Sequence, residues 1–386
     1  HNCHEERPRT PPTGPPSATK RCTIMGAQQS TSALPATMRR LVLTHGAMDF
    51  DGVTIAVEEC PIPTPRSGEV LVKVVAAPVN PSDYGKWKGK PGPPPKPVAM
   101  GLEGSGTVVA SGGGVMAGSM VGKRIGFTNP AKGQGSYSEY VTVSALQCFP
   151  MPDEVPLEDA CSFFVNPFTA YAIVDTARSR GSPGLVLTAA ASQLGQMLVK
   201  LCKEERYPIV CVVRREAQAE TLRALGAEHV VVTAGGEAKE LKETIAQLGI
   251  TVAFDAVAGP MTAALLAALP NKSTVYVFGR LSGEPAHCPP LDLIYFEKKV
   301  EGFLVAGHAG SWLRKDGLIK MGLRQRACAQ RVCPALAEGG WAASTFVDCT
   351  PDTMWASFLS LYKSEGFTGK KLRVRLDGGA DATSAA

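Results

Sequence analysis

The stretch VLTAAASQLGQMLVK, residues 186–200, places small residues where an apolar strand-like segment runs into a helix-like one. Small residues at such a turn let backbone N–H groups approach a phosphate at the N-terminus of the following helix. Alanine is small enough, but it does not readily take the positive φ that glycine allows. Ser192 is suited to cap the helix or to donate its hydroxyl to a phosphate, and Gly195 permits close helix–strand contact. The turn therefore indicates either a pyrophosphate site or a tight structural turn.

Two arginines follow the next strand-like segment, in CVVRREAQ. A fold that binds NAD usually has an acid at this place, about 20 residues past the small-residue turn, which holds the ribose hydroxyls. Arg214 and Arg215 would instead clamp a 2′-phosphate, and Glu216 stands one residue too late to be that acid. The pair predicts NADPH as the cofactor; the alternative is that both arginines are a solvated helix start.

Other kinds of chemistry find little support. The 6 histidines and 11 cysteines are scattered, without a CxxC pair and without a spacing suited to metal ligands. No G-x-S-x-G elbow marks a nucleophilic serine. We therefore expect no metal. An odd number of cysteines, several of them inside apolar segments, is typical of a reducing compartment.

Length and composition set the broad class of the protein. The chain has 386 residues, 44% hydrophobic and 19% charged, which is enough for about two domains. A net charge of +5 is mild and no Lys/Arg run appears, so we expect no nucleic-acid partner. No apolar run approaches the roughly 18 residues of a membrane span, so we expect no integral membrane segment.

The texture of the sequence changes at about Asn166. Before it, residues 39–146 hold short segments rich in Val, Ile and Thr between Gly and Pro, typical of a β-barrel or sandwich, with a stiff loop at 88–97. After it, strands alternate with amphipathic helices. Six strands, several apolar throughout, predict an α/β fold with a doubly wound parallel sheet buried on both faces. The closing GKKLRVRL is expected to be a strand that returns to the first domain.

We therefore predict three segments: 1–37, then a β-rich domain of 38–165 with 335–386, and a nucleotide-binding domain of 166–334. The first is rich in Pro, Ser and Thr, and is predicted to be disordered or a targeting segment. It is the end of an organellar transit peptide, a leader to a myristoylated start at Met25 (MGAQQS), a stretch before a start at Met38, or a linker or artefact. The predicted location is accordingly cytoplasmic or organellar (mitochondrion or plastid).

Many motifs recur in an order that resembles the medium-chain dehydrogenase/reductase superfamily, from about Met38 to Leu376. They are APVNPSDYGKWKG, GLEGSGTVVASG, VGKRIGF, GSYSEYVTV, NPFTAYAIVDTA, TAAASQLGQ, LGAEHVV, FDAVAG and GKKLRVRL. Zinc-dependent members carry a Cys where this chain has Asn80-Pro81, and a His-Glu pair where it has Leu102-Glu103. The chain is therefore more similar to the zinc-free branch of quinone oxidoreductases and 2-enoyl thioester reductases. The resemblance implies a GroES-like β-rich domain beside a Rossmann sheet, and a homodimer.

The resemblance also implies the site. The nicotinamide would lie near Asn166 and Thr169, flanked by Phe278, Gly279 and Phe303. The pyrophosphate would meet Ala191, Ser192, Gln193 and Leu194, and the 2′-phosphate would meet Arg214 and Arg215. Lys370 or Lys371 would close the site.

The proton donor is less plain. The 2-enoyl thioester reductases carry a tyrosine a few residues after NPSD, and here Pro91 stands at that place. Tyr84 is the candidate donor, or it stacks beside the cofactor; Asn80 is a second candidate catalytic residue, or a turn former. Because a quinone needs no carbon protonation, we expect an NADPH-dependent quinone or enone reductase with a small-molecule substrate between its domains. The alternatives are a trans-2-enoyl-CoA/ACP reductase of fatty acid synthesis and a non-catalytic NADPH-binding relative.

Overall fold

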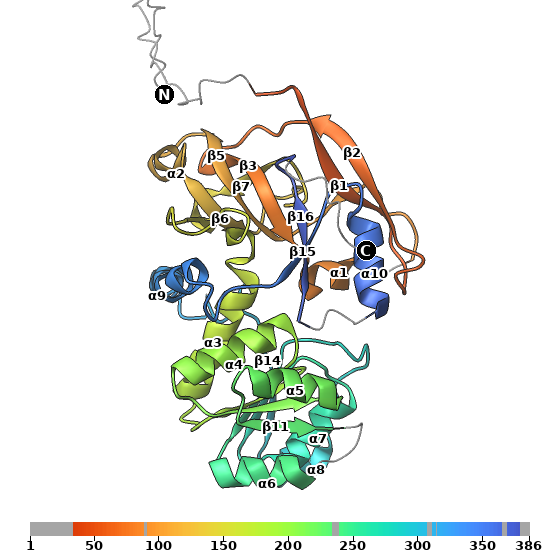
Figure 1. The fold of residues 1–386 in the computed structure, drawn as a ribbon, viewed down its shortest axis with the longest axis vertical. Helices are drawn as coiled ribbons and strands as arrows, with labels where there is room; N and C mark the ends of the chain where they lie inside the picture. Colours follow the sequence, from red (N-terminus) through yellow and green to blue (C-terminus); the bar gives the residue numbers. More distant parts are fainter. Residues whose placement is uncertain are drawn as a thin grey trace, which may run out of the picture.

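The computed structural model describes residues 34–88, 91–233, 239–306, 311–313, 315–364 and 369–378. Most of the predicted N-terminal segment, residues 1–33, lies outside the described residues, and Thr37 already begins the first strand. A β-rich half and a half built on a parallel sheet lie one above the other, and α3 runs between them (Figure 1).

The β-rich half contains two sheets. The larger has the order β15-β16-β3-β5-β6-β8, with β7 paired to β3 off this path, and the smaller has the order β2-β1-β4. The strands are β1 (Thr37–His45), β2 (Thr54–Pro61), β3 (Glu69–Pro78), β4 (Val98–Ala99), β5 (Glu103–Ser111), β6 (Arg124–Thr128), β7 (Tyr140–Ser144), β8 (Cys148–Pro150), β15 (Phe346–Cys349) and β16 (Lys371–Arg375). The helices are α1 (Pro81–Trp87), α2 (Val115–Met120), η1 (Ala145–Gln147), η2 (Ala160–Ser162) and α10 (Met354–Ser364). The expected closing strand is β16, antiparallel to β3.

The second half is a six-stranded parallel sheet in the order β11-β10-β9-β12-β13-β14. Its strands are β9 (Leu185–Thr188), β10 (Ile209–Val213), β11 (His229–Val232), β12 (Val252–Asp255), β13 (Thr274–Val277) and β14 (Lys299–Gly302). Its helices are α3 (Val165–Ser179), α4 (Gln193–Glu204), α5 (Glu216–Ala224), α6 (Lys239–Leu248), α7 (Pro260–Ala268), α8 (Pro290–Ile294) and α9 (Leu318–Ala337). The order reverses next to β9, so the predicted doubly wound sheet is confirmed.

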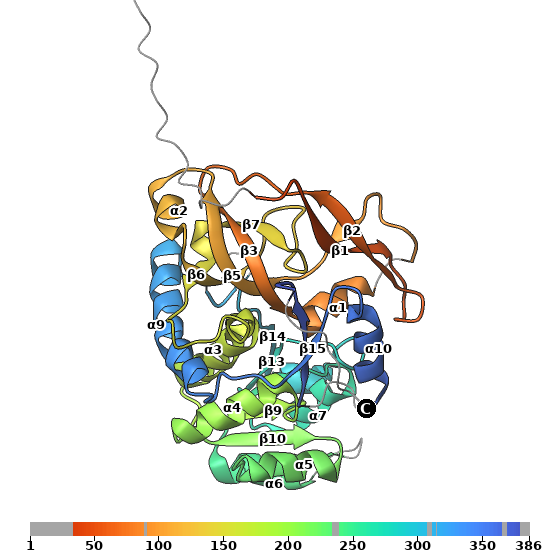
Figure 2. The same cartoon turned by 45° about the horizontal axis from the view of Figure 1, so that its top comes forward.

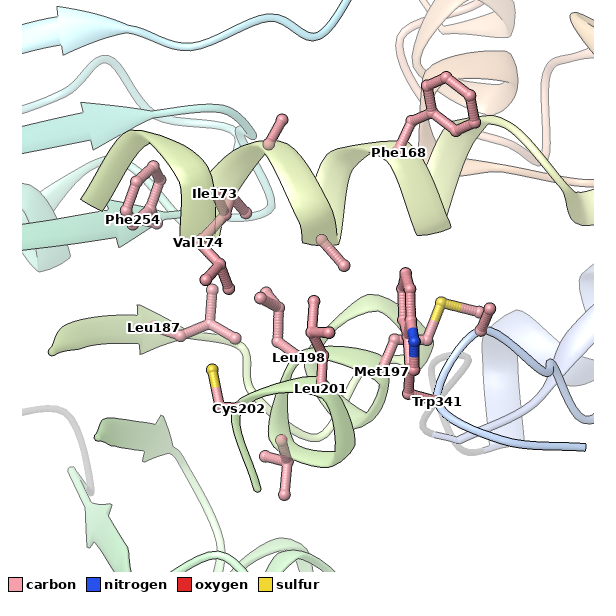
Figure 3. Packing of buried hydrophobic residues seen from close by; sticks show 14 of the residues in the cluster. Phe168, Ile173, Val174, Leu187, Met197, Leu198, Leu201, Cys202, Phe254 and Trp341 are labelled. Atoms are coloured by element: carbon pink, nitrogen blue, oxygen red, sulfur yellow. The ribbon is translucent and has the colours of Figure 1, made fainter. Parts of the chain in front are cut away.

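The inner strands β9, β10, β12 and β13 are mostly apolar and buried at nearly every position, so the sheet is buried on both faces. Leu185 and Leu187 of β9 face the core formed with α3, α4, α5 and α9, whereas Val186 faces the core of α6 and α7. Figure 3 shows α3 packed on α4, with Ile173 and Val174 near Leu198 and Leu201. Close packing of this kind makes the sheet and its covering helices a rigid support for the residues at the ends of the strands.

The helices α9 and α10 are among those that the sequence reasoning did not anticipate. The 20-residue helix α9 packs on α3, and α10 packs on the β-rich core. The expected domain boundary after residue 334 falls inside α9. The segment limits stay predictions.

Candidate active site

An open pocket of about 500 Å³ lies at the carboxyl ends of β13 and β14. In an open α/β sheet this edge is where ligands bind. The pocket is lined by Val277, Phe278, Gly279, Arg280, Gly302, Phe303 and Leu304, which include three of the residues expected beside the nicotinamide. Helices α1 and α10 lie on the side of the β-rich half that faces the parallel sheet (Figures 1 and 2). Arg280 Nη2 donates to the carbonyl of Gly85 in α1 at 3.1 Å, which ties the pocket rim to that half.

The turn between β9 and α4 is tighter than its alanines suggest. Ala189 adopts φ 51°, a left-handed conformation that alanine adopts at a cost. A Cβ on Gly195 would lie 2.0 Å from the carbonyl oxygen of Ala190, so no larger residue fits there. Ser192 Oγ accepts the N–H of Gly195 at 3.2 Å and caps α4. The structure therefore brings a small-residue turn to the N-terminus of α4, whose first N–H groups lack partners within the helix.

The other side chains expected at the pyrophosphate have different surroundings. Gln193 is buried, with its amide nitrogen on the carbonyl of Gly369 and its amide oxygen accepting the N–H of Thr345 at 3.4 Å. Leu194 packs against the core, and Ala191 is buried. In this segment the side chains of Ala191, Gln193 and Leu194 are therefore turned into the protein, and the backbone is what remains available to a ligand.

Arg214 and Arg215 follow the end of β10 and are both exposed. The N–H of Arg214 donates to Gln218 Oε1 at 3.2 Å, and Arg215 is the N-cap residue of α5. Neither guanidinium forms an ion pair with another described residue, whereas Arg223 in the same helix pairs with Glu216. Two unpaired cations thus lie at the carboxyl edge of the sheet, where a 2′-phosphate would need them.

Sequence reasoning missed Asp255, which is fully buried at the end of β12. Its Oδ1 accepts from Thr188 Oγ1 at 2.9 Å and from the N–H groups of Val257 and Ala258 at 2.9 and 3.2 Å. Its Oδ2 accepts from Thr262 Oγ1 at 2.7 Å. This carboxylate fastens the ends of β9 and β12 together at the point where the strand order reverses. The sequence signal that could have indicated Asp255 is its place as an acid at the end of the apolar run TVAFD.

Asn80 lies in a buried polar network. Its Nδ2 donates to Glu103 Oε1 at 2.9 Å, and its Oδ1 accepts from Lys371 Nζ at 2.7 Å. Burial lowers the pKa of Lys371, and the charge of Glu103 opposes that shift. Burial raises the pKa of Glu103, opposed first by Lys371. Of the two lysines expected to close the site, only Lys371 is in this network; Lys370 is exposed.

Glu103 also joins the network to α3, which carries the other residues expected beside the nicotinamide. Its Oε2 accepts the N–H groups of Phe164 and Val165, at 3.1 and 2.8 Å, where α3 begins. Asn166 is buried one residue further on, and Thr169 Oγ1 donates to the carbonyl of Val165 at 2.5 Å. The acid therefore caps the helix terminus at which negative charge is favourable.

Tyr84, the candidate proton donor, belongs to an aromatic cluster between α1 and α10. Its ring centroid is 5.5 Å from that of Phe358, 6.0 Å from Phe50 and 6.2 Å from Trp87. Burial raises its pKa well above that of a free phenol. Pro91, at the place of the family tyrosine, is exposed. The catalytic roles of Tyr84 and Asn80 stay predictions.

The fold and site define a nucleotide-binding oxidoreductase architecture, and known proteins share it. Residues 66–153 match the family described as Alcohol dehydrogenase GroES-like domain, and residues 194–315 match Zinc-binding dehydrogenase. Within the described residues no group of three or more His, Cys, Asp or Glu is placed to hold a metal ion.

Individual relatives agree with these families. The chain is 30% identical to Prostaglandin reductase-3 of Mus musculus, over 65% of this chain and 66% of that protein. It is 29% identical to the mitochondrial Enoyl-[acyl-carrier-protein] reductase of Bos taurus, over 72% of this chain and 75% of that protein. The structure of a "putative NADPH:quinone reductase" from Mesorhizobium loti superimposes with a TM-score of 0.76 and 28% identity, covering 89% of this chain and all of that one.

The chain belongs to the medium-chain dehydrogenase/reductase superfamily, in its zinc-independent branch. The predicted combination of a Rossmann sheet with a GroES-like β-rich domain is confirmed.

The buried carboxyl of Asp83 offers a test of the electrostatics of this region. It lies beside the Asn80 network, where Oδ2 accepts the N–H of Asn80 at 2.9 Å and Oδ1 has no hydrogen-bond partner among the described residues. Burial raises its pKa from 3.8 to about 7, and the negative charge of Glu103 adds to this. Between these pH values the folded state keeps a proton on Asp83 that the unfolded state has lost. The Asp83 contribution to stability is therefore lost as pH rises from about 4 to about 7.

We expect Asp83→Asn to remove this loss, because the amide keeps an acceptor for Asn80 and carries no charge. The free energy of unfolding from urea denaturation should therefore be larger for D83N than for the wild type at pH 8, and this gain in stability should exceed that at pH 4.5 by on the order of 2–4 kcal/mol. Asp153→Asn, at a side chain that is 95% exposed, is the control. A pH dependence of D83N equal to that of the wild type would contradict the assignment.

Proposed function

We propose that the protein is an NADPH-dependent, zinc-independent reductase that transfers hydride to a quinone or to the activated C=C bond of an enone. The observation that carries this proposal is the meeting of three features at one edge of the parallel sheet. A small-residue turn precedes α4, two unpaired arginines follow β10, and an open pocket lies beyond β13 and β14. These positions suit, in turn, the pyrophosphate, the 2′-phosphate and the nicotinamide of one extended cofactor.

The residues of the chain fit this cofactor. The turn leaves no room for a Cβ at Gly195, so backbone can approach a pyrophosphate closely. Gly279 is equally constrained, because a Cβ there would lie 2.5 Å from the carbonyl oxygen of Ala256. Among the residues that the structure describes, Arg214 and Arg215 have no acidic partner to give up before they bind a phosphate, whereas Arg223 pairs with Glu216.

Bound NADPH would supply the hydride. The protein would bind and orient the cofactor and the substrate, and it would exclude water. Phe278, Gly279 and Phe303 form the walls against which the nicotinamide would rest. Asn166 and Thr169 would present polar groups from α3. The hydrogen bond from Arg280 to Gly85 keeps α1 close to the pocket rim, from which the β-rich half would cover the reacting atoms. Excluding water in this way strengthens the electrostatic interactions inside the cleft.

A second candidate substrate class is the 2-enoyl thioester. The enoyl reductase of Bos taurus covers more of this chain than the prostaglandin reductase does, which favours this class. The exposed Pro91 in place of the family tyrosine favours acceptors that need no carbon protonation.

The expected homodimer and compartment stay predictions. β14 is the last strand of the parallel sheet, so its outer edge is the natural place for a second copy. Within the parts of the chain that the structure describes, no helix is both long and apolar enough to cross a membrane.

Turnover with a panel of acceptors tests the proposal. NADPH oxidation should be fast with a quinone or an enone, and at least tenfold slower with crotonyl-CoA. Faster reduction of crotonyl-CoA would assign the thioester class instead. Tight NADPH binding without turnover of any acceptor would make the protein a non-catalytic relative.

The two arginines should set the choice of cofactor. Arg214→Ala and Arg215→Ala should each weaken NADPH by about 10–100-fold and leave NADH nearly unchanged, because each removes a charge-assisted contact to the 2′-phosphate alone. Arg206→Ala is a matched control, since Arg206 is exposed at the opposite end of β10. Dissociation constants from cofactor fluorescence measure the effect. Equal losses for both cofactors would refute the assignment.

Tyr84→Phe separates a proton donor from a packing residue. We expect it to lower kcat for an enone roughly 10²-fold, as loss of a general acid does, and to spare a quinone. Tyr362→Phe is the control, because Tyr362 stacks on Phe358 in the same cluster. Small and similar effects of both changes would leave Tyr84 as a packing residue.

A further inference from the structure

One face of β16 carries two buried cations that hold the chain segment leading into α3. Lys371 is 4% exposed and reaches Glu103 through Asn80. Arg373, two residues along and therefore on the same face, is 9% exposed. Its guanidinium binds Asp348 at 2.5 and 2.9 Å and Asp159 at 2.7 Å, immediately before η2. Strand β16 is thus connected to both ends of the segment that runs from Asp159 to the start of α3 and joins the two halves.

At the start of α3 the connection to β16 runs through one carboxylate, that of Glu103. Glu103 comes from β5, yet both of its oxygens are used by other elements: one by Asn80, the other by two backbone N–H groups at the start of α3. Among the described residues, Lys371 is the cation whose charge compensates Glu103, and Asn80 hydrogen-bonds to both. The charged groups that face Lys371 are Glu103 and Asp83, with the thiol of Cys161 beside them.

We propose that Lys371 is a positioning residue for hydride transfer: acting through Asn80 and Glu103, it fixes the N-terminus of α3, and with it Asn166 and Thr169, against the β-rich half. This inference rests on the proposed function. It departs from the expectation that a lysine here touches the cofactor, since Lys371 Nζ binds Asn80 inside the protein. The network occupies the positions Asn80 and Glu103, where zinc-dependent members of the family would have metal-site residues. Here hydrogen bonds through the Asn80 amide order the same junction.

Amide hydrogen exchange tests the positioning without requiring turnover. In Lys371→Met the amides of Phe164 and Val165 should exchange at least tenfold faster, because an uncompensated buried Glu103 takes up a proton and accepts their hydrogen bonds less strongly. Lys73→Met, at an exposed lysine of β3, should exchange like the wild type. Wild-type exchange at these two amides in K371M would overturn the proposal.

Kinetics and a double variant separate positioning from a loss of folding. K371M should lower the single-turnover hydride rate about tenfold and change the NADPH dissociation constant less than threefold. Adding Glu103→Gln should recover part of that rate and of the amide protection, since the neutral pair leaves no buried charge. A double variant no better than K371M would refute the relay. If the wild type reduces no acceptor, the proposed function fails, and the positioning role is decided by exchange alone.

Discussion

The carboxylate of Glu103 is the interaction on which the junction of the two halves depends. It is fully buried, and an ionised carboxylate in such a place is tolerated only when its lone pairs are satisfied and its charge is compensated. The structure provides an amide from α1's N-cap residue, two N–H groups at the start of α3 and, one hydrogen bond further, a lysine of β16. Each of these partners belongs to a different element. Satisfying one acid therefore sets the relative positions of the β-rich sheet and of α3, the helix proposed to face the cofactor.

Close backbone approach is the second constraint, and it acts at the other end of the site. Both sides of the crevice contain glycines whose extra carbon would meet a carbonyl oxygen: Gly195 against Ala190, and Gly279 against Ala256. Ala189 adopts a positive φ at a cost of about 1–2 kcal/mol. Strain of this kind persists only where surrounding structure enforces it. Here the buried Asp255 network ties the ends of β9 and β12 and supplies that rigidity.

The sequence was informative wherever the physical signal was local. Apolar strands alternating with amphipathic helices were sufficient to predict the parallel sheet, and the residues after β10 alone indicated the arginine pair. The Asn80 network was beyond this reasoning, because its partners are separated by 23 and 291 residues and meet only in the folded chain. The resemblance pointed to Asn80 and to either Lys370 or Lys371, but it did not indicate that Lys371 binds Asn80. Helix α9 was missed as well; its many charged residues and Pro334 conceal the apolar stripe that packs on α3.

The surroundings of Tyr84 bear on how a substrate would receive its proton. Burial among aromatic rings raises the pKa of Tyr84, which makes its hydroxyl a weaker acid than a free phenol. A weaker acid transfers a proton efficiently only to a strongly basic centre, such as the enolate that follows hydride addition to an enone. A reduced quinone needs no such help, because its oxygens exchange protons with water. The raised pKa therefore leaves quinone reduction unaffected, and it suits Tyr84 to protonation of a strongly basic carbon.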